Sequence, residues 1–239
     1  MIKIMFILVS VICVVILASV FLALRVPQLN IASHLSENEK LDALDKWFEL
    51  VHKKEKFNGS VLLSKKGRVV FSKSYGLDAA ETPTQLTEHS SFNLASVSKQ
   101  FTAMGIVILN HQSKLNYQDK LSDHIPELSY YKDITIRNLL HHTSGLPDYM
   151  YLAGKKRNDS DVFSTAEMIS LYNKDTPKLN FKSGSKFQYS NAGYVLLAEI
   201  IARASGVSFQ KFMATHVFKP LKRRYKVRSL SDNASVPVG

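Results

Sequence analysis

The fold is decided by one short stretch, residues 92–102, which read FNLASVSKQFT. Ser96 and Lys99 stand three positions apart in it, and an apolar run begins there that continues to about His111. The apolar side chains recur at helical spacing, so the segment predicts a largely buried helix with Ser96 at its start. Because positions i and i+3 share a helix face, we expect the Lys99 ammonium to approach the Ser96 hydroxyl.

A serine followed three positions later by a lysine is suited to nucleophilic catalysis. A serine hydroxyl is a weak nucleophile unless a neighbouring base takes its proton, and a lysine near other positive charge can be that base. The N–H groups of a first helical turn lack partners inside the helix, so they can stabilise an oxyanion. The pattern also arises by chance, and the alternative is an ordinary helix start with a solvated lysine.

A second segment supplies possible partners for this pair. Residues 181–191 read FKSGSKFQYSN and form a loop centred on Tyr189-Ser190-Asn191 that leads into a helix. Together with Ser96-Val97-Ser98-Lys99, and with LLHHTSGL at residues 139–146, this loop resembles the serine beta-lactamase and penicillin-binding-protein family. The nearest branch contains class C beta-lactamases, D-Ala-D-Ala carboxypeptidases and related esterases. The resemblance spans roughly residues 57–221.

This resemblance implies a role for each of four residues. Ser96 would attack a carbonyl carbon and form an acyl-enzyme, and Asn191 would hold the substrate amide. Lys99 and Tyr189 would share the roles of general base and then general acid. Free tyrosine has a pKa of about 10, so Tyr189 would be a base at neutral pH only if the lysine cation favours its phenolate. Which of the two takes the proton stays open, and a helix-capping loop is the alternative for Tyr189 and Asn191.

The implied substrates are small molecules or peptides: beta-lactams, peptides ending in D-Ala, or simple esters. No metal or cofactor is needed. The glycine spacing excludes GxG, GxSxG and GxxxxGK loops, and no HExxH pair is present. Cys13 is the single cysteine, which excludes a disulfide framework within the chain. We expect a structural role for the neighbouring His141 and His142, and also for the segment that contains Ser144.

The expected fold is α/β (α+β) and beta-lactamase/transpeptidase-like, with a helical subdomain and an antiparallel sheet. A capping box at Ser36 and Glu39 begins an amphipathic helix that ends near Lys54. Two strands joined by Lys65-Lys66-Gly67 should form a hairpin. The expected strands are Ser60–Ser64 and Arg68–Tyr75, and further helices are expected at Ile136–His142, Thr165–Asn173, Tyr194–Ala204 and Ser208–His216.

The sequence also departs from the family. The third family motif, K-T-G or H-x-G on a later strand, is not found after Asn191. Only the first two strands of the family sheet are expected, which predicts a C-terminally truncated member. An inactive remnant or binding module is therefore the alternative to an active hydrolase. The open edge of a two-stranded sheet invites pairing with a partner chain.

The N-terminus predicts a membrane anchor. Residues 4–24 carry no charge, and at about 1.5 Å of rise per residue they match a hydrocarbon core of about 30 Å. A cleaved signal, giving a secreted product, is the alternative. We divide the chain into an anchor at 1–25, a juxtamembrane segment with the first helix at 26–56, and a partial beta-lactamase-related domain at 57–239. From the resemblance we expect an extracytoplasmic body, at the cell surface or in the periplasm.

Composition and charge limit the class of protein and the kinds of partner that we expect. With 45% apolar and 21% charged residues the chain is globular in composition. Its net charge of +11 owes much to a basic run within residues 219–228. No nucleic-acid motif accompanies this run, so we expect a solvated face or tail and no nucleic-acid partner.

Overall fold

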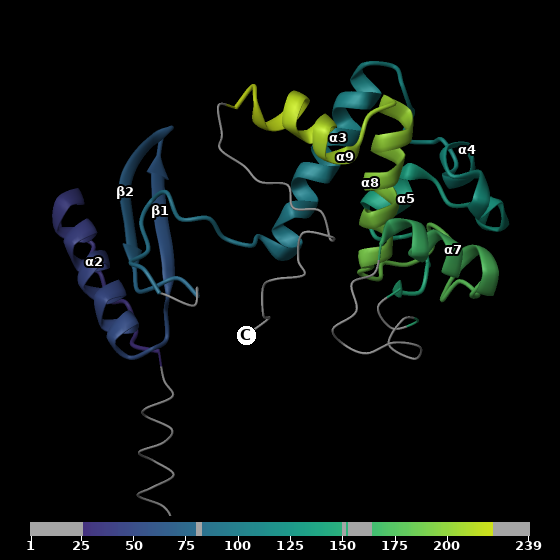
Figure 1. Cartoon of the computed structure of the whole chain (residues 1–239). Coiled ribbons are helices and arrows are strands. Elements are labelled where there is room, and N and C mark those ends of the chain that lie inside the picture. Colours follow the sequence, from purple (N-terminus) through teal and green to yellow (C-terminus); the bar gives the residue numbers. More distant parts are fainter. Residues whose placement is uncertain (1–25, 80–82, 150–151, 153–163, 222–239) are drawn as a thin grey trace, which may run out of the picture. The chain divides into compact units, whose positions relative to one another are not determined.

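The computed structural model of the 239-residue chain describes residues 26–79, 83–149, 152 and 164–221. It consists of helices and one two-stranded sheet (Figure 1). The contacts divide the chain into two compact units, residues 1–93 and 94–239, which are described separately below. The predicted anchor at residues 4–24 and most of the basic run lie outside the described residues.

None of the described helices is by itself long and apolar enough to cross a bilayer. Asn191–Ser205 and Phe209–Phe218 meet that requirement only when taken as a pair, which is bent by 79°.

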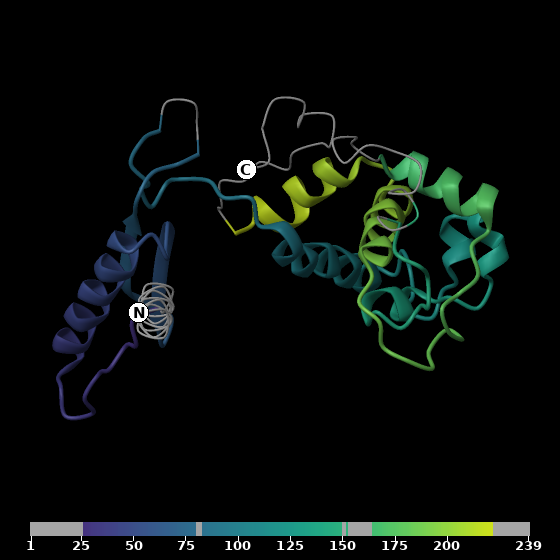
Figure 2. The same ribbon diagram turned by 90° about the horizontal axis from the view of Figure 1, so that it is seen from below.

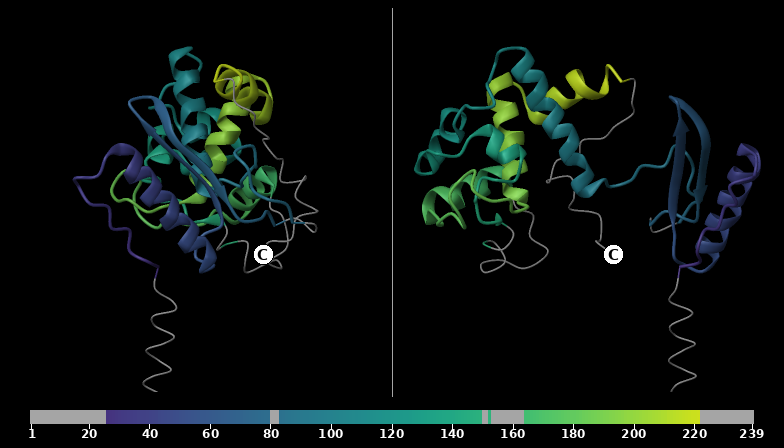
Figure 3. Two further views of the ribbon diagram at one scale, coloured as in Figure 1. Left: turned by 90° about the vertical axis from the view of Figure 1, so that its left-hand side faces the viewer. Right: turned by 180° about the vertical axis from the view of Figure 1, so that it is seen from behind.

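The first unit contains helix α2 (Glu37–Lys53) and a hairpin. The predicted capping box is confirmed: Ser36 Oγ accepts a hydrogen bond from the Glu39 N–H, and the Glu39 carboxylate accepts one from the Ser36 N–H at 2.8 Å. The helix packs against the hairpin (Figure 3), and aromatic side chains take part in this contact. Phe48 stacks on Tyr75 with ring centroids 5.5 Å apart, and the Tyr75 hydroxyl donates to Asp45 at 2.7 Å.

The hairpin has the predicted strands, β1 (Gly59–Lys65) and β2 (Arg68–Tyr75), paired antiparallel. Its two-residue turn is Lys66-Gly67, with φ of 50° and 77°. Two positive φ angles match the right-handed twist of the flanking strands, which is why glycine is favoured in such a turn. A register shift lies between Leu63 and Ser64.

The second unit is built on two helices that pack against each other, α3 (Lys99–His111) and α8 (Asn191–Ser205). A short 3₁₀ turn, η1 (Ala95–Ser98), precedes α3. Smaller elements surround the pair (Figure 2): α4 (Leu121–His124), η2 (Pro126–Tyr131), α5 (Ile136–Leu140), α7 (Thr165–Asp175), α9 (Phe209–Met213) and the π-helical turn η3 (Ala214–Phe218).

The approach of α3 to α8 depends on a glycine. A Cβ at Gly105 would lie 2.7 Å from Ile201 Cδ1 and 3.4 Å from Met213 Sδ. Around this contact the core is made of fully buried aliphatic and aromatic side chains, which include Ile106, Leu109, Leu139, Leu196, Leu197, Ile200 and Phe212. A side chain at position 105 would therefore collide with Ile201 of α8, which would have to move within a packed core.

Every predicted helix is present, with shifted ends. Helix α8 begins at Asn191, three residues before the expected start, so Asn191 lies in the first helical turn. The last predicted helix is interrupted, because α9 continues as the π-helical turn η3. Helix α5 ends at Leu140, two residues early, and His142 has a left-handed φ of 57° that a helix cannot contain.

We predict that Gly105→Leu lowers the free energy of unfolding by about 1–3 kcal/mol, because the added carbons overpack the contact between α3 and α8. Urea unfolding followed by circular dichroism measures the change. Met104→Leu is the control, since Met104 is 49% exposed on the same helix and should change stability by less than about 0.5 kcal/mol. Equal stability of the two variants would contradict the packing described for Gly105.

Candidate active site

The 3₁₀ turn η1 brings Ser96 and Lys99 together. Side chains three residues apart eclipse each other in a 3₁₀ turn, and Lys99 Nζ donates to Ser96 Oγ at 3.2 Å. Ala95, directly before Ser96, has a left-handed φ of 43°. Such a conformation costs energy in a residue other than glycine, and it occurs preferentially at functional sites. The backbone before Ser96 is thus held in a specific, unfavourable conformation.

The start of α8 supplies the other two predicted residues. The Tyr189 hydroxyl donates to Ser96 Oγ at 2.8 Å, across 93 positions of sequence. Asn191 Oδ1 accepts a hydrogen bond from Lys99 Nζ at 2.9 Å. The same Nζ lies 5.0 Å from the centroid of the Tyr189 ring. The structure therefore brings all four predicted residues into one hydrogen-bonded group.

The loop that carries Tyr189 is bound along its length to residues 142–145. Three backbone hydrogen bonds join them, from the N–H groups of Asn180, Gly184 and Gln188 to the carbonyls of Gly145, Thr143 and His142. Gly145 has a φ of 79°, and a Cβ there would lie 2.3 Å from the Phe181 carbonyl oxygen. Only glycine can hold this turn so close to the loop.

His142 supports Tyr189 from the same turn. The two rings lie 4.6 Å apart, and the Ser190 N–H donates to His142 Nδ1 at 3.2 Å. Burial lowers the pKa of His142, and the Lys99 charge lowers it further. The ring is consequently neutral at neutral pH and carries its proton on Nε2. The structural role expected for this histidine agrees with the geometry, but its contact with Tyr189 was not anticipated.

Asp148 is the second residue that the sequence did not reveal. Its Oδ2 accepts from the Asn191 N–H at 2.8 Å and from Asn191 Nδ2 at 3.2 Å. Asp148 follows the turn at residues 144–147, and nothing in its local pattern points to a helix that begins 43 positions later. Ser190 occupies the N-cap position of α8, but among the described residues its buried hydroxyl has no hydrogen-bond partner.

The charge of Lys99 acts on Tyr189. Hydrogen bonding with Lys99, then with Ser96, lowers the pKa of the Tyr189 phenol, and the charge of Lys99 adds to this effect. The side chain is 47% exposed, so solvent reaches the group. The arrangement contains an exposed hydroxyl with a cation and an acidified phenol beside it, and a neighbouring group that can take the serine proton is what activates a serine as a nucleophile.

Neither Ser144 nor a cluster of metal ligands provides a second reactive site among the described residues. Ser144 is 2% exposed, and its hydroxyl accepts a hydrogen bond from the Leu146 N–H within the turn, as the structural role expected for its segment implies. No group of three or more His, Cys, Asp or Glu side chains among the residues that can be described is placed to hold a metal ion.

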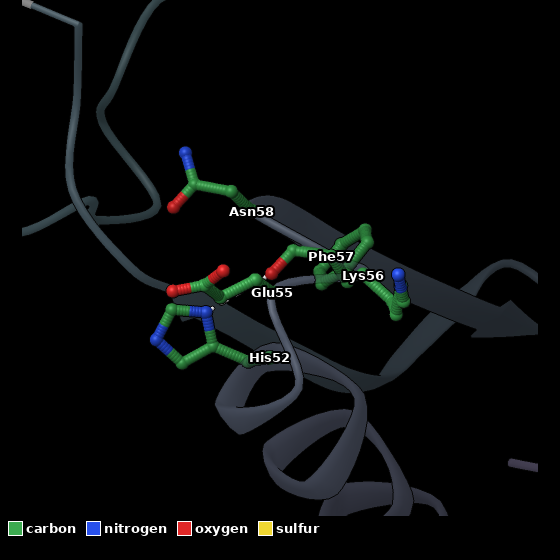
Figure 4. Close-up of a pocket in the computed structure, with 5 residues that line it drawn as sticks. All are labelled: His52, Glu55, Lys56, Phe57 and Asn58. Atoms are coloured by element: carbon green, nitrogen blue, oxygen red, sulfur yellow. Dashed lines mark hydrogen bonds between the residues drawn. The ribbon is translucent and has the colours of Figure 1, made fainter. Parts of the chain in front are cut away.

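A hollow of about 330 Å³ lies in the first unit, at the end of α2 (Figure 4). The side chain of Asn58 at its wall donates to the Leu77 carbonyl at 2.8 Å and accepts from the Leu77 N–H at 3.1 Å. His52 Nδ1 lies 3.0 Å from the Phe57 carbonyl oxygen. These polar groups bind the backbone of their own unit, and the hollow contains none of the four predicted site residues.

The chain is similar in sequence to a known family over most of its length. The model of the Beta-lactamase family matches residues 44–225. Penicillin-binding protein 4* of Bacillus subtilis (strain 168) is 36% identical over 184 residues, which cover 77% of this chain and 41% of that protein. Protein flp of Staphylococcus aureus (strain MW2) is 29% identical over 171 residues, which cover 70% of this chain and 34% of that protein. The chain thus spans less than half the length of these curated relatives.

Solved structures give the same result. A penicillin-binding protein from Bacillus halodurans matches with a TM-score of 0.63 and 30% identity, covering 72% of this chain and 52% of that chain. A class C beta-lactamase matches with a TM-score of 0.65 and 26% identity, covering 80% of this chain and 51% of the other. The expected beta-lactamase/transpeptidase-like fold, with its helices and two-stranded antiparallel sheet, is confirmed over about half of each neighbour.

We predict that Gly145→Ala destabilises the second unit by at least about 2 kcal/mol more than Gly206→Ala. Both glycines have a left-handed φ, 79° and 74°, but a Cβ at Gly206 meets nothing within 4 Å. The difference therefore isolates the close approach to Phe181 from the backbone strain that both variants share. Urea unfolding of the two variants measures it, and equal losses would show that the turn does not need this approach.

We predict a pH-dependent stability that depends on His142. Its folded pKa is lowered, whereas the unfolded value is about 6.5. As the pH falls below about 6.5 the unfolded chain takes up a proton that the folded chain does not, so stability decreases. His142→Gln should show a smaller decrease than the wild type in melting temperatures taken across this range. His111→Gln, at the exposed end of α3, should keep the wild-type dependence, and a His142→Gln profile parallel to wild type would refute the assignment.

Proposed function

The chain belongs to the beta-lactamase family of serine hydrolases and penicillin-binding proteins, and on this basis we propose that it forms an acyl-enzyme on Ser96. One observation carries the proposal. Ser96 Oγ lies within hydrogen-bond distance of both the Tyr189 hydroxyl, at 2.8 Å, and Lys99 Nζ, at 3.2 Å. A nucleophile in contact with its base, and a base oriented by further groups, is the arrangement that serine catalysis needs.

Tyr189 is the general base in this proposal. Its oxygen is the nearer of the two candidates, and the Lys99 cation lowers its pKa. The phenolate takes the proton of Ser96 Oγ while the oxygen bonds to the carbonyl carbon of the substrate. The C–N or C–O bond of the leaving group then breaks, and Tyr189 returns the proton to the departing amine or alkoxide. Hydrolysis of the acyl-enzyme uses the same groups: Tyr189 takes a proton from water, the water oxygen bonds to the acyl carbon, the bond from that carbon to Ser96 Oγ breaks, and Tyr189 returns the proton to Ser96 Oγ.

The relatives support the choice of substrate class. Proteins named penicillin-binding and a class C beta-lactamase are among the matches, so beta-lactams and peptides ending in D-Ala come first and simple esters second. Asn191 holds the substrate amide in this scheme. The predicted anchor at residues 4–24 would place the reaction at the outer face of a membrane, where such peptides are exposed.

A second candidate function is that of a non-catalytic binding module. The described sheet has two strands, and apolar side chains on it are exposed, among them Leu62 at 63% and Val69 at 59%. A ribbon of this kind is marginal in water by itself and exposes edges to a partner strand. A module that pairs with another chain would use the sheet and have no need of Ser96 chemistry.

We predict that the full chain is labelled covalently by a fluorescent penicillin or by a fluorophosphonate, and that Ser96→Ala abolishes the label. Tyr189→Phe removes the general base and should slow labelling by about 100- to 10,000-fold. Tyr130→Phe is the matched control, because Tyr130 is 62% exposed and outside the site. The rates are measured from gel fluorescence over time.

Three results would speak against the proposal. Labelling that persists in Ser96→Ala would reject Ser96 as the nucleophile. Equal rates for wild type and Tyr189→Phe would reject the phenol as the base. A well-folded wild-type chain that neither reagent labels would favour the binding module.

A further inference from the structure

Two hydrogen bonds from one residue converge on a single oxygen of Asp148. Asp148 Oδ2 accepts from the backbone N–H of Asn191 at 2.8 Å and from its side-chain Nδ2 at 3.2 Å. The first bond is a capping interaction, since the N–H groups of the first helical turn lack partners inside α8 and a carboxylate there interacts favourably with the helix dipole. The second bond has no role in capping.

The second bond fixes which way the Asn191 amide points. A carboxylate on one side selects the NH₂ end, so the carbonyl end faces the opposite side, where Oδ1 accepts from Lys99 Nζ at 2.9 Å. In the flipped orientation the amide oxygen would face the carboxylate and the NH₂ group would face the ammonium. Both contacts would then be repulsive, so the charges of Asp148 and Lys99 together permit one orientation.

The amide also transmits polarisation between the two charges. Donation from Nδ2 to a carboxylate increases the negative charge on Oδ1, which strengthens the bond that Oδ1 accepts from the ammonium. Lys99 Nζ is simultaneously 3.2 Å from Ser96 Oγ. The chain of contacts runs from Asp148 through Asn191 and Lys99 to the nucleophile.

We propose that Asp148 is a positioning residue that acts through the Asn191 side chain to hold Lys99 beside Ser96 and Tyr189. The inference rests on the proposed function, because it assigns Asp148 to the same reaction. Displacements of about 1 Å in a catalytic group can cost about 100-fold in rate. Asp148→Asn keeps an acceptor but removes the charge, and it should slow fluorophosphonate labelling by about 10- to 100-fold.

A double-mutant cycle separates positioning from simple capping. In an Asn191→Ala background the backbone N–H still reaches Asp148, but the side-chain amide is gone. Asp148→Asn should then still lower the melting temperature, while its effect on the labelling rate falls below about twofold. Asp133→Asn is the matched control, since Asp133 is exposed and outside the site, and it should change neither quantity. The same rate loss in both backgrounds, or no loss in either, would overturn the inference.

A spectroscopic measurement tests the inference without labelling. The side-chain amide protons of Asn191 should move upfield in Asp148→Asn, and they should also move in Lys99→Gln, because the amide is polarised from both ends. Unchanged amide chemical shifts in Asp148→Asn would overturn the inference, whether or not the wild type is labelled. A wild type that is not labelled counts only against the proposed acyl-enzyme. If Asp148→Asn fails to fold, Asp148→Glu replaces it. This variant keeps the charge and moves the carboxylate by one methylene, so it should slow labelling less than Asp148→Ala does.

Discussion

The contact between α3 and α8 is the interaction on which the rest of the second unit depends. Gly105 leaves room for the Ile201 side chain of α8, and the packing of the two helices places the residues before α3 next to the first turn of α8. Ser96 and Lys99 come from one helix start and Asn191 from the other, so the hydrogen bond from Lys99 to Asn191 joins two ends that packing has already aligned. Apolar burial thus supplies the energy, and the polar groups select the geometry.

The local parts of this arrangement were predictable from sequence. The capping box at Ser36, the turn at Lys66-Gly67 and the periodic helices depend on side chains within a few positions of each other, and all are found. The four predicted site residues came from the resemblance of three short segments, and the structure brings their side chains together. Asp148 and the contact of His142 with Tyr189 were not found, because each acts on a residue more than forty positions away and no local pattern marks such a contact.

Lys99 lies near two rings, Tyr189 and His142, and its charge has different consequences for them. Hydrogen bonding with Lys99 is the main cause that lowers the pKa of Tyr189, whereas burial is the main cause for His142 and the charge of Lys99 adds to it. The consequences differ because the two rings have different ordinary pKa values: the imidazole stays neutral, while the phenol is moved toward ionisation. Lys99 therefore favours the phenolate of Tyr189 and disfavours a second positive charge on His142.

The division of the chain into two units bears on how the protein is made. All four predicted site residues, and the turn that orients their loop, belong to residues 94–239, and the hairpin belongs to the preceding unit. A ribosome adds about 5–20 residues per second, so Ser96 exists for several seconds of synthesis before Tyr189 and Asn191 are added. The hydrogen-bonded group of four residues can therefore form only after α8 has been synthesised and has packed against α3.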